Sequence, residues 1–95
     1  MLIHHTHTDR GGRFYLDEPA DSTTELVYKM QGPHKMIIEH TEVSNKHEGK
    51  GIGKLLVSSA VDFARSQHIK ILPLCTFAHS VIARTSEFQD VLAQS

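Results

Sequence analysis

A run of glycines and lysines in the middle of the chain has the composition of an anion-binding turn. It reads Glu48-Gly49-Lys50-Gly51-Ile52-Gly53-Lys54, with Lys46 nearby, and it precedes an apolar pattern with helical spacing. Glycines let a backbone approach a ligand closely, and the free N–H groups at a helix start attract anions. The run therefore predicts a phosphate or pyrophosphate site. A glycine turn that only enters a helix is the simpler alternative.

Two common phosphate-binding loops do not fit this run. A Walker A loop needs four residues between its glycines and a Ser or Thr after the lysine. Here Gly49 and Gly53 are one residue too close, and Leu55 follows Lys54. A dinucleotide fingerprint needs G-x-G-x-x-G after the first strand of a longer fold, whereas this run is G-x-G-x-G.

Two side chains outside this run have the chemistry for acyl and proton transfer. Cys75 is the only thiol, and a thiol becomes a nucleophile when a nearby histidine lowers its pKa. Packing as a small apolar residue is the alternative for Cys75. His40, near the end of an apolar strand, can take a proton from an ammonium group, or can be a structural histidine. Glu39 and Glu42 are secondary candidates for the base, on opposite strand faces.

A cluster of histidines near the start of the chain also has ligand chemistry. His5 and His7 share one face of the first expected strand, and His4 lies beside them. No cysteine or carboxylate completes a tetrahedral set at the usual spacing. We therefore expect a solvated edge strand and no metal site.

The first half of the chain must supply most of the sheet that positions these groups. Its β-branched and aromatic runs predict four strands, and its Gly, Pro and Asp clusters predict the connections. The strands are expected at 2–7, 13–16, 25–30 and 35–43, with a turn at 9–12, a loop at 17–24 and a Gly-Pro turn at 31–33.

The second half predicts a crossover unit and a helical tail. Apolar residues recur at helical spacing from Ile52 to Ala64, and a fifth strand follows at 69–77. Strand four, the helix and strand five then form one βαβ-like unit. A short helix is expected at 78–83, and Ser86 caps a last helix containing Phe88, Val91 and Leu92.

Pro73 lies inside the fifth expected strand and bears on how that strand pairs with strand four. A proline inside a strand cannot donate to the ladder. Its presence suggests that strand five is unpaired on one side at this point. Such a gap would expose backbone groups to a ligand.

Length and composition narrow the function classes. The chain has 95 residues, 39% of them hydrophobic, and a formal net charge of −1, which is typical of one globular domain spanning 1–95. The charge argues against nucleic-acid binding, and no apolar run is long enough for a membrane span. One cysteine and the absence of a signal-peptide pattern favour a reducing, cytoplasmic compartment. We expect a monomer.

Three segments together resemble the minimal GNAT-type acyltransferases, which are short single-domain relatives of the acetyl-coenzyme A-dependent N-acetyltransferases. They are the strand ending in residues 39–43, the glycine run with the following Leu55-Leu56, and residues 71–77. The resemblance covers residues 13 to 92. It implies a compact α/β (α+β) fold with a mixed, mostly antiparallel sheet, a central helix after strand four and a short C-terminal helical segment.

The resemblance also implies a ligand and a reaction. Acetyl-coenzyme A (acetyl-CoA) would bind between splayed strands four and five, and an amine, from a small molecule or a protein, would attack its thioester. Gly51 and Gly53 match the family's pyrophosphate motif, whereas Glu48 replaces its usual Gln or Arg. His40 and Cys75 are then the candidate catalytic residues. The expected cofactor-binding residues are Thr41, Val43, Glu48, Gly49, Lys50, Gly51, Ile52, Gly53, Lys54, Cys75 and Phe77.

Two other classes of function stay open at this stage. The chain is shorter than most members of that superfamily, so a non-catalytic acyl-CoA-binding module is the first rival. A small protein-interaction domain with a vestigial glycine loop is the second. Binding of a coenzyme A ester would exclude the protein-interaction domain. Acetyltransferase activity would then distinguish an enzyme from a non-catalytic binding module.

Overall fold

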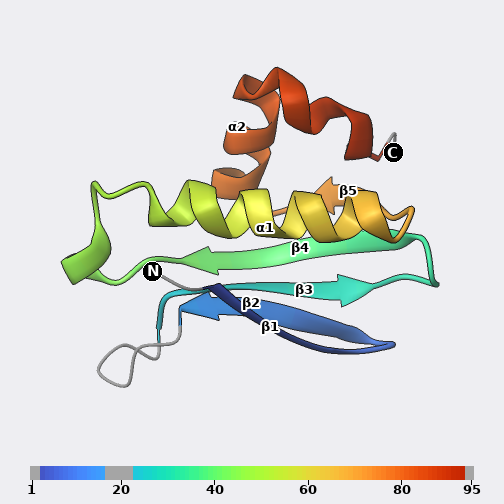
Figure 1. Cartoon of the computed structure of the whole chain (residues 1–95), viewed down its shortest axis with the longest axis horizontal. Helices are drawn as coiled ribbons and strands as arrows, with labels where there is room; N and C mark the ends of the chain where they lie inside the picture. Colours follow the sequence, from blue (N-terminus) through green and yellow to red (C-terminus); the bar gives the residue numbers. More distant parts are fainter. Residues whose placement is uncertain (1–2, 17–22, 94–95) are drawn as a thin grey trace.

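Five strands form one mixed sheet in the order β1-β2-β3-β4-β5 (Figure 1). The first four are antiparallel neighbours, and the fifth pairs with β4 in parallel. They are β1 (Ile3–Thr8), β2 (Gly11–Leu16), β3 (Glu25–Met30), β4 (Lys35–Glu42) and β5 (Lys70–Pro73). The expected mixed, mostly antiparallel sheet is confirmed.

The structure is a computed structural model, and it describes residues 3–16 and 23–93. Most of the expected loop at 17–24 lies outside the described residues, as does Leu2 at the start of the first expected strand. No helix within the described ranges is long and apolar enough to cross a membrane.

One long helix covers a face of the sheet, and the C-terminal segment packs beside it (Figure 1). The long helix is α1 (Ile52–Ser66), which connects β4 to β5 as the apolar periodicity predicted. After β5 the chain forms α2 (Thr76–Arg84) and a 3-10 helix, η2 (Ser86–Val91). A single 3-10 turn, η1 (Asn45–His47), precedes the glycine run.

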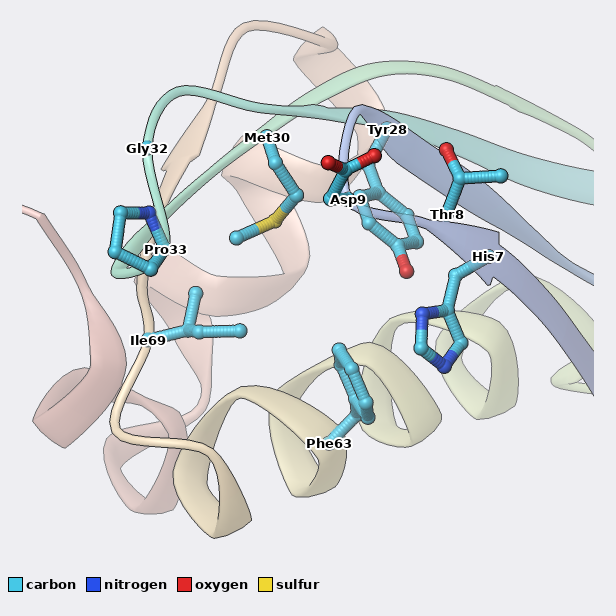
Figure 2. Close-up of a pocket in the computed structure, with 9 residues that line it drawn as sticks. All are labelled: His7, Thr8, Asp9, Tyr28, Met30, Gly32, Pro33, Phe63 and Ile69. Atoms are coloured by element: carbon cyan, nitrogen blue, oxygen red, sulfur yellow. The ribbon is translucent and has the colours of Figure 1, made fainter.

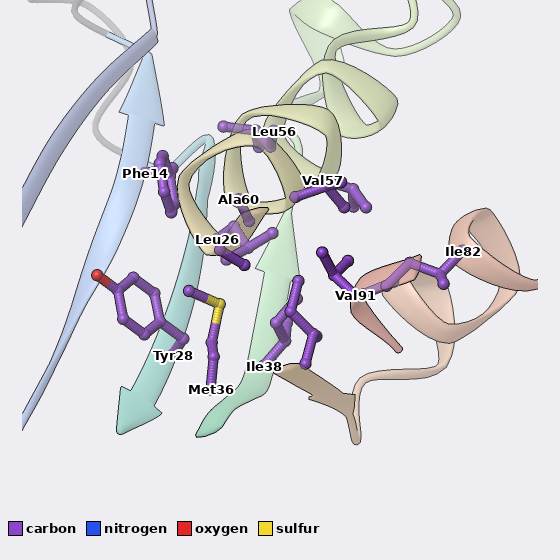
Figure 3. Close-up of a cluster of buried hydrophobic side chains, with 14 of the residues drawn as sticks. Phe14, Leu26, Tyr28, Met36, Ile38, Leu56, Val57, Ala60, Ile82 and Val91 are labelled. Carbon is purple, nitrogen blue, oxygen red and sulfur yellow. The ribbon is translucent and has the colours of Figure 1, made fainter. Parts of the chain in front are cut away.

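The hydrophobic core lies between α1 and the sheet (Figure 3). From the strands it contains Phe14, Leu26, Tyr28, Met36 and Ile38, all nearly inaccessible to solvent. The helices contribute Leu56, Val57, Ala60, Ile82 and Val91. Alternate strand residues and every third or fourth helix residue therefore meet in one layer.

Several expected boundaries were wrong, and two of the errors affect the site. The fifth strand ends at Pro73 and not at residue 77, because a proline cannot continue the ladder. The next helix begins at Thr76 and not at Ala78, so Phe77 is helical and Cys75 is the N-cap residue of α2. The last segment is a 3-10 helix with Thr85 at its N-cap, where an α-helix capped by Ser86 was expected.

The first hairpin also differs from expectation. β2 begins at Gly11, and the turn consists of Asp9 and Arg10. Gly11 and Gly12 thus belong to the strand. A Cβ at Gly12 would lie 2.7 Å from the Cβ of His7 and 2.8 Å from the Tyr28 hydroxyl, so the glycine permits close packing there.

Candidate acyl-transfer site

β4 and β5 separate part-way along their length. Their parallel pairing runs from Lys35 with Lys70 to Ile38 with Pro73. The backbone N–H groups of Leu74 and Cys75 both donate to the Ile38 carbonyl oxygen, at 3.0 and 3.2 Å. Beyond that point β4 continues to Glu42 without β5 beside it. This confirms the gap that Pro73 suggested.

A β-bulge decides which β4 side chains face the helices. Val27 pairs with His40, but the next residue, Tyr28, pairs with Ile38, so Glu39 is an extra residue in β4. An extra residue in a strand moves each later side chain to the opposite face of the sheet from the one that simple alternation predicts. Ile38 is buried, His40 is exposed, and Thr41 is half-buried. The bulge therefore turns Thr41 toward the α1 side of the sheet and His40 toward the opposite face.

The glycine run forms the turn into α1, as expected. Gly49 and Gly51 have φ angles of +79° and +75°, in the left-handed region that favours glycine. Gly51 is the N-cap of α1, no side chain caps the helix there, and its first turn contains no acidic residue. The first helical hydrogen bond runs from the Leu55 N–H to the Gly51 carbonyl oxygen. The N–H groups before Leu55 therefore have no helical acceptor, which suits an anion.

A cavity of about 520 Å³ extends from this turn to the open end of β4. Nine of its lining residues are among the expected cofactor-binding residues: Thr41, Val43, Glu48, Gly49, Gly51, Ile52, Gly53, Lys54 and Phe77. Lys50 is exposed and does not line the cavity, and neither does Cys75. The volume is ordinary for a small-molecule site. We refer to it below as the transfer cavity.

The C-terminal helix contributes lining residues that the sequence prediction missed. Val81 and Arg84 line the transfer cavity from α2. Phe77, Val81 and Arg84 are spaced i, i+4, i+7 and so share one helix face. That spacing would have identified Arg84 if the helix had been expected to begin at Thr76 and to reach residue 84.

The absence of a side chain at Gly53 lets the start of α1 lie close to α2 at the transfer cavity. A Cβ at this position would lie 2.5 Å from Cζ of Phe77 and 3.3 Å from Cγ2 of Val43. Gly53 is buried, and Phe77 is 40% exposed. The missing side chain thus lets the helix start, the end of β4 and the Phe77 ring meet at one point.

Charges of both signs border the transfer cavity. Lys54 and Arg84 supply positive charge from α1 and α2, and both are exposed. Glu48 is also exposed and supplies a negative charge from the turn. Two cations and a helix N-terminus against one carboxylate leave the cavity suited to an anionic group.

The Cys75 thiol lies beside Thr41 at the point where β4 and β5 separate. Burial by itself raises the pKa of this thiol. The Thr41 hydroxyl and the backbone N–H groups of Ala78 and Phe77 at the start of α2 outweigh that effect, so the pKa falls below its usual value. The Thr41 Oγ1 atom is buried and has no hydrogen bond of ordinary geometry within the described ranges.

The His40 side chain lies on the opposite face of the sheet from Thr41 and is not placed beside Cys75. The His40 side chain is 47% exposed, and its Nε2 lies 3.2 Å from Oε1 of Glu42. The bulge also corrects the expectation that Glu39 and Glu42 lie on opposite faces. Both are exposed, Glu39 pairs with Lys29 at 3.4 Å, and both point away from α1. His40 as the base therefore remains a prediction that requires an acceptor on the outer face of the sheet.

The histidine cluster is only partly the solvated edge that was expected. β1 is an edge strand and His7 is exposed, but His5 is half-buried. The His5 ring stacks on Phe14 with centroids 4.0 Å apart, and its Nε2 lies 2.5 Å from the Tyr28 hydroxyl. Within residues 3–16 and 23–93, no group of three or more His, Cys, Asp or Glu side chains is placed to hold a metal ion.

Comparison with known proteins agrees with this geometry. A family model described as GCN5-related N-acetyl-transferase matches residues 13–91. The protein belongs to the GCN5-related N-acetyltransferase (GNAT) family. Members of this family generally use acetyl-CoA as a co-substrate, and the match spans both the strand gap and the glycine turn.

Individual relatives match different shares of the chain. The proteins named NATD1 from Gallus gallus, Mus musculus and Homo sapiens are 30% identical over 57 residues, which is 60% of this chain. The matched segment spans about half the length of these curated relatives, 50 to 52%. The solution structure of a GCN5-like candidate N-acetyltransferase from Staphylococcus aureus is 28% identical, with a TM-score of 0.74. That alignment covers 97% of this chain and 89% of the other, so the GNAT fold is shared throughout.

Proposed function

We propose that this protein transfers an acetyl group from acetyl-CoA to an amine. The observation that carries the proposal is the transfer cavity, which connects the unpaired end of β4 to the uncapped N-terminus of α1. One end offers N–H groups and cations, and the other offers an unpaired strand edge beside a thiol. A long ligand with an anionic end and a thioester at the other end fits this arrangement.

The anionic end of the donor belongs at the glycine turn. The free N–H groups of Gly53 and its neighbours would bind the pyrophosphate oxygens, with Lys54 and Arg84 adding charge. The Glu48 backbone N–H already donates to the Asn45 carbonyl oxygen at 3.3 Å, so it is not a free donor, and its exposed side chain stays in solvent. Affinity then rests on the backbone and the two cations.

The pantetheine arm belongs along the open edge of β4. Thr41 and Val43 line the transfer cavity there. The buried Thr41 hydroxyl, which lacks an ordinary hydrogen bond, can donate to an amide or thioester oxygen. This hydroxyl, which faces only the Cys75 thiol, is the feature of the described residues that most directly fits the donor.

The reaction that fits this site is direct attack by the amine. The amine nitrogen forms a bond to the thioester carbonyl carbon, the C–S bond breaks, and coenzyme A leaves as a thiolate that takes up a proton. A backbone N–H at the gap polarises the carbonyl oxygen. His40, on the outer face, accepts the proton released by the ammonium form of the acceptor, and Glu42 lies 3.2 Å from its Nε2.

The alternative route uses Cys75 as a transient acyl carrier. Its thiolate would attack the thioester, release coenzyme A and pass the acetyl group to the amine. Cys75→Ala distinguishes the routes. Direct transfer predicts that kcat falls by less than about tenfold, whereas an acyl-cysteine route predicts loss of turnover and of a burst in coenzyme A release.

The test of the function begins with binding. Isothermal titration with acetyl-CoA should give a one-to-one signal that Gly53→Glu abolishes, because a carboxylate there clashes with Phe77 and repels the pyrophosphate. Gly32→Ala is the control for a glycine substitution elsewhere, since Gly32 lies in the β3–β4 turn and does not line the transfer cavity. An absence of binding by the unmodified chain would overturn the proposal.

A non-catalytic acyl-CoA-binding module is the second candidate. The observation that favours it is the placement of His40, whose side chain pairs with Glu42 on the outer face and not with Cys75. Binding of acetyl-CoA with no release of coenzyme A across a panel of amines, in both the unmodified chain and the His40→Ala variant, would favour the module.

A further inference from the structure

A second cavity, of about 380 Å³, is shown in Figure 2 and reaches Phe63 near the C-terminal end of α1, whereas the transfer cavity lies at the start of that helix. Its apolar walls come from β3, the β3–β4 turn, α1 and the residue before β5, and they consist of Tyr28, Met30, Pro33, Phe63 and Ile69. It shares no lining residue with the transfer cavity. We call it the hairpin cavity, because the β1–β2 hairpin forms its remaining side.

The hairpin side supplies the polar groups. His7, Thr8 and Asp9 line it there, and Figure 2 shows the Asp9 carboxylate and the His7 ring on that side. Among the described residues that line the hairpin cavity, Asp9 is the only acid, and none is a lysine or arginine. Within residues 3–16 and 23–93, Asp9 makes no ion pair. Its charge is therefore available to a cationic ligand.

The aromatic residues add a second preference for a cation. Phe63, Tyr28 and His7 surround the space beneath Asp9, and the Phe63 and His7 rings lie 5.4 Å apart. Ring faces attract ammonium groups, and apolar walls favour a ring on the ligand. The Tyr28 hydroxyl is already engaged by His5, so it does not compete with Asp9 as the polar anchor.

The size and position of the hairpin cavity define what it can hold. Its volume is at the small end of small-molecule sites, enough for a single ring with a short side chain. Phe63 lies ten positions after Gly53, which corresponds to about 15 Å along α1. A ligand here is therefore too far from the glycine turn to be part of the donor site.

We propose that the hairpin cavity is a second ligand site that binds a small aromatic amine, with the ammonium group at Asp9 and the ring between Met30, Phe63 and Ile69. This site does not depend on acetyl-CoA binding. Its occupancy would fix the hairpin against the end of α1.

The test uses side-chain methyl groups as reporters in NMR. Met30 lines the hairpin cavity, whereas Ile82 is fully buried on α2, does not line that cavity and serves as the internal reference. Titration with 2-phenylethylamine should shift the Met30 methyl signal saturably, with a dissociation constant on the order of 1 mM, and leave the Ile82 methyl signals nearly unmoved. The acid of matched size, 3-phenylpropanoate, should bind at least about fivefold more weakly.

Charge-removing variants complete the test. Asp9→Asn should weaken binding of the amine by about threefold to tenfold and remove its advantage over the acid. Asp62→Asn is the control, because Asp62 is an exposed acid on α1 that does not line the cavity. An unmoved Met30 signal, equal binding of amine and acid, or an equal effect of the two variants would each overturn the proposal.

Discussion

The Cys75 thiol and the Thr41 hydroxyl face each other where β5 leaves β4. Cys75 ends the connection from β5 to α2, and Thr41 is the first inward-facing residue after the bulge in β4. Thr41 and the N–H groups at the start of α2 lower the pKa of the thiol against the opposing effect of burial. The pairing joins two elements that are otherwise separated at this point.

Thr41→Val is expected to raise the pKa of Cys75. The substitution keeps the shape of the side chain but removes the hydroxyl, so burial opposes ionisation with less compensation. The measurement is the rate of alkylation by iodoacetamide as a function of pH, whose midpoint should move upward. Thr41→Ser keeps the hydroxyl and should leave the midpoint nearly in place. Equal midpoints for the valine variant and the unmodified chain would show that Thr41 does not act on the thiol.

Gly53→Ala is expected to reduce acetyl-CoA affinity more than stability. The added Cβ would displace the Phe77 ring, which is the end of a mobile side chain and can move into the cavity. We expect affinity to fall at least about tenfold, with a loss of about 1 kcal/mol or less in the free energy of unfolding. Titration calorimetry and urea denaturation measure the two effects.

Gly51→Ala is the matched comparison for Gly53. Nothing lies within 4 Å of a Cβ at Gly51, but its φ of +75° strains any other residue. We expect this variant to lose about 1–2 kcal/mol of stability. If both variants lost stability equally and bound acetyl-CoA equally, the close approach at Gly53 would have no role in the ligand site.

The charges around the transfer cavity predict opposite effects for two substitutions. Arg84→Gln removes a cation and should weaken acetyl-CoA binding by about threefold to tenfold, whereas Glu48→Gln removes an anion and should strengthen it by about twofold to fivefold. Both effects should shrink as salt is raised, because exposed charges are screened. Titrations at two salt concentrations measure this. If Arg84→Gln bound acetyl-CoA at low salt as tightly as the unmodified chain, α2 would not contribute to the anion site.

The sequence predicted the parts of the site that depend on local chemistry. The glycine turn into α1 and the strand gap beside Pro73 are consequences of a few neighbouring residues. The orientation of His40 is different, because the bulge at Glu39 depends on how β3 pairs with β4. Alternation within one strand cannot show an inserted residue, so the outward turn of His40 was not predictable.

The contribution of Arg84 was missed for a related reason. Thr76 and Phe77 have strand-like composition, and they were expected to continue β5. The chain bends into α2 because Pro73 ends the ladder and the next two N–H groups both bind the Ile38 carbonyl. The helix face that carries Arg84 follows from that tertiary contact.

The His5 ring is expected to destabilise the protein as the pH falls. Burial, and then the neighbouring His7, lower its pKa from 6.5 to about 4, while Tyr28 holds its Nε2. The unfolded chain therefore binds a proton below about pH 6.5 that the folded chain does not take up until about pH 4. Stability falls across that window, by about 1–2 kcal/mol once the partial exposure of the ring is allowed for.

Urea denaturation at pH 7 and pH 4.5 measures this effect. The informative variant is the double substitution His5→Phe with Tyr28→Phe, which removes the titrating ring without leaving the tyrosine hydroxyl unpaired. Its stability should fall less between the two pH values than that of the unmodified chain, because carboxylates titrate in both and only His5 differs. His79→Phe, at an exposed histidine on α2, should follow the unmodified chain. An equal pH dependence in the double variant would mean that His5 is protonated in the fold as readily as in the unfolded chain.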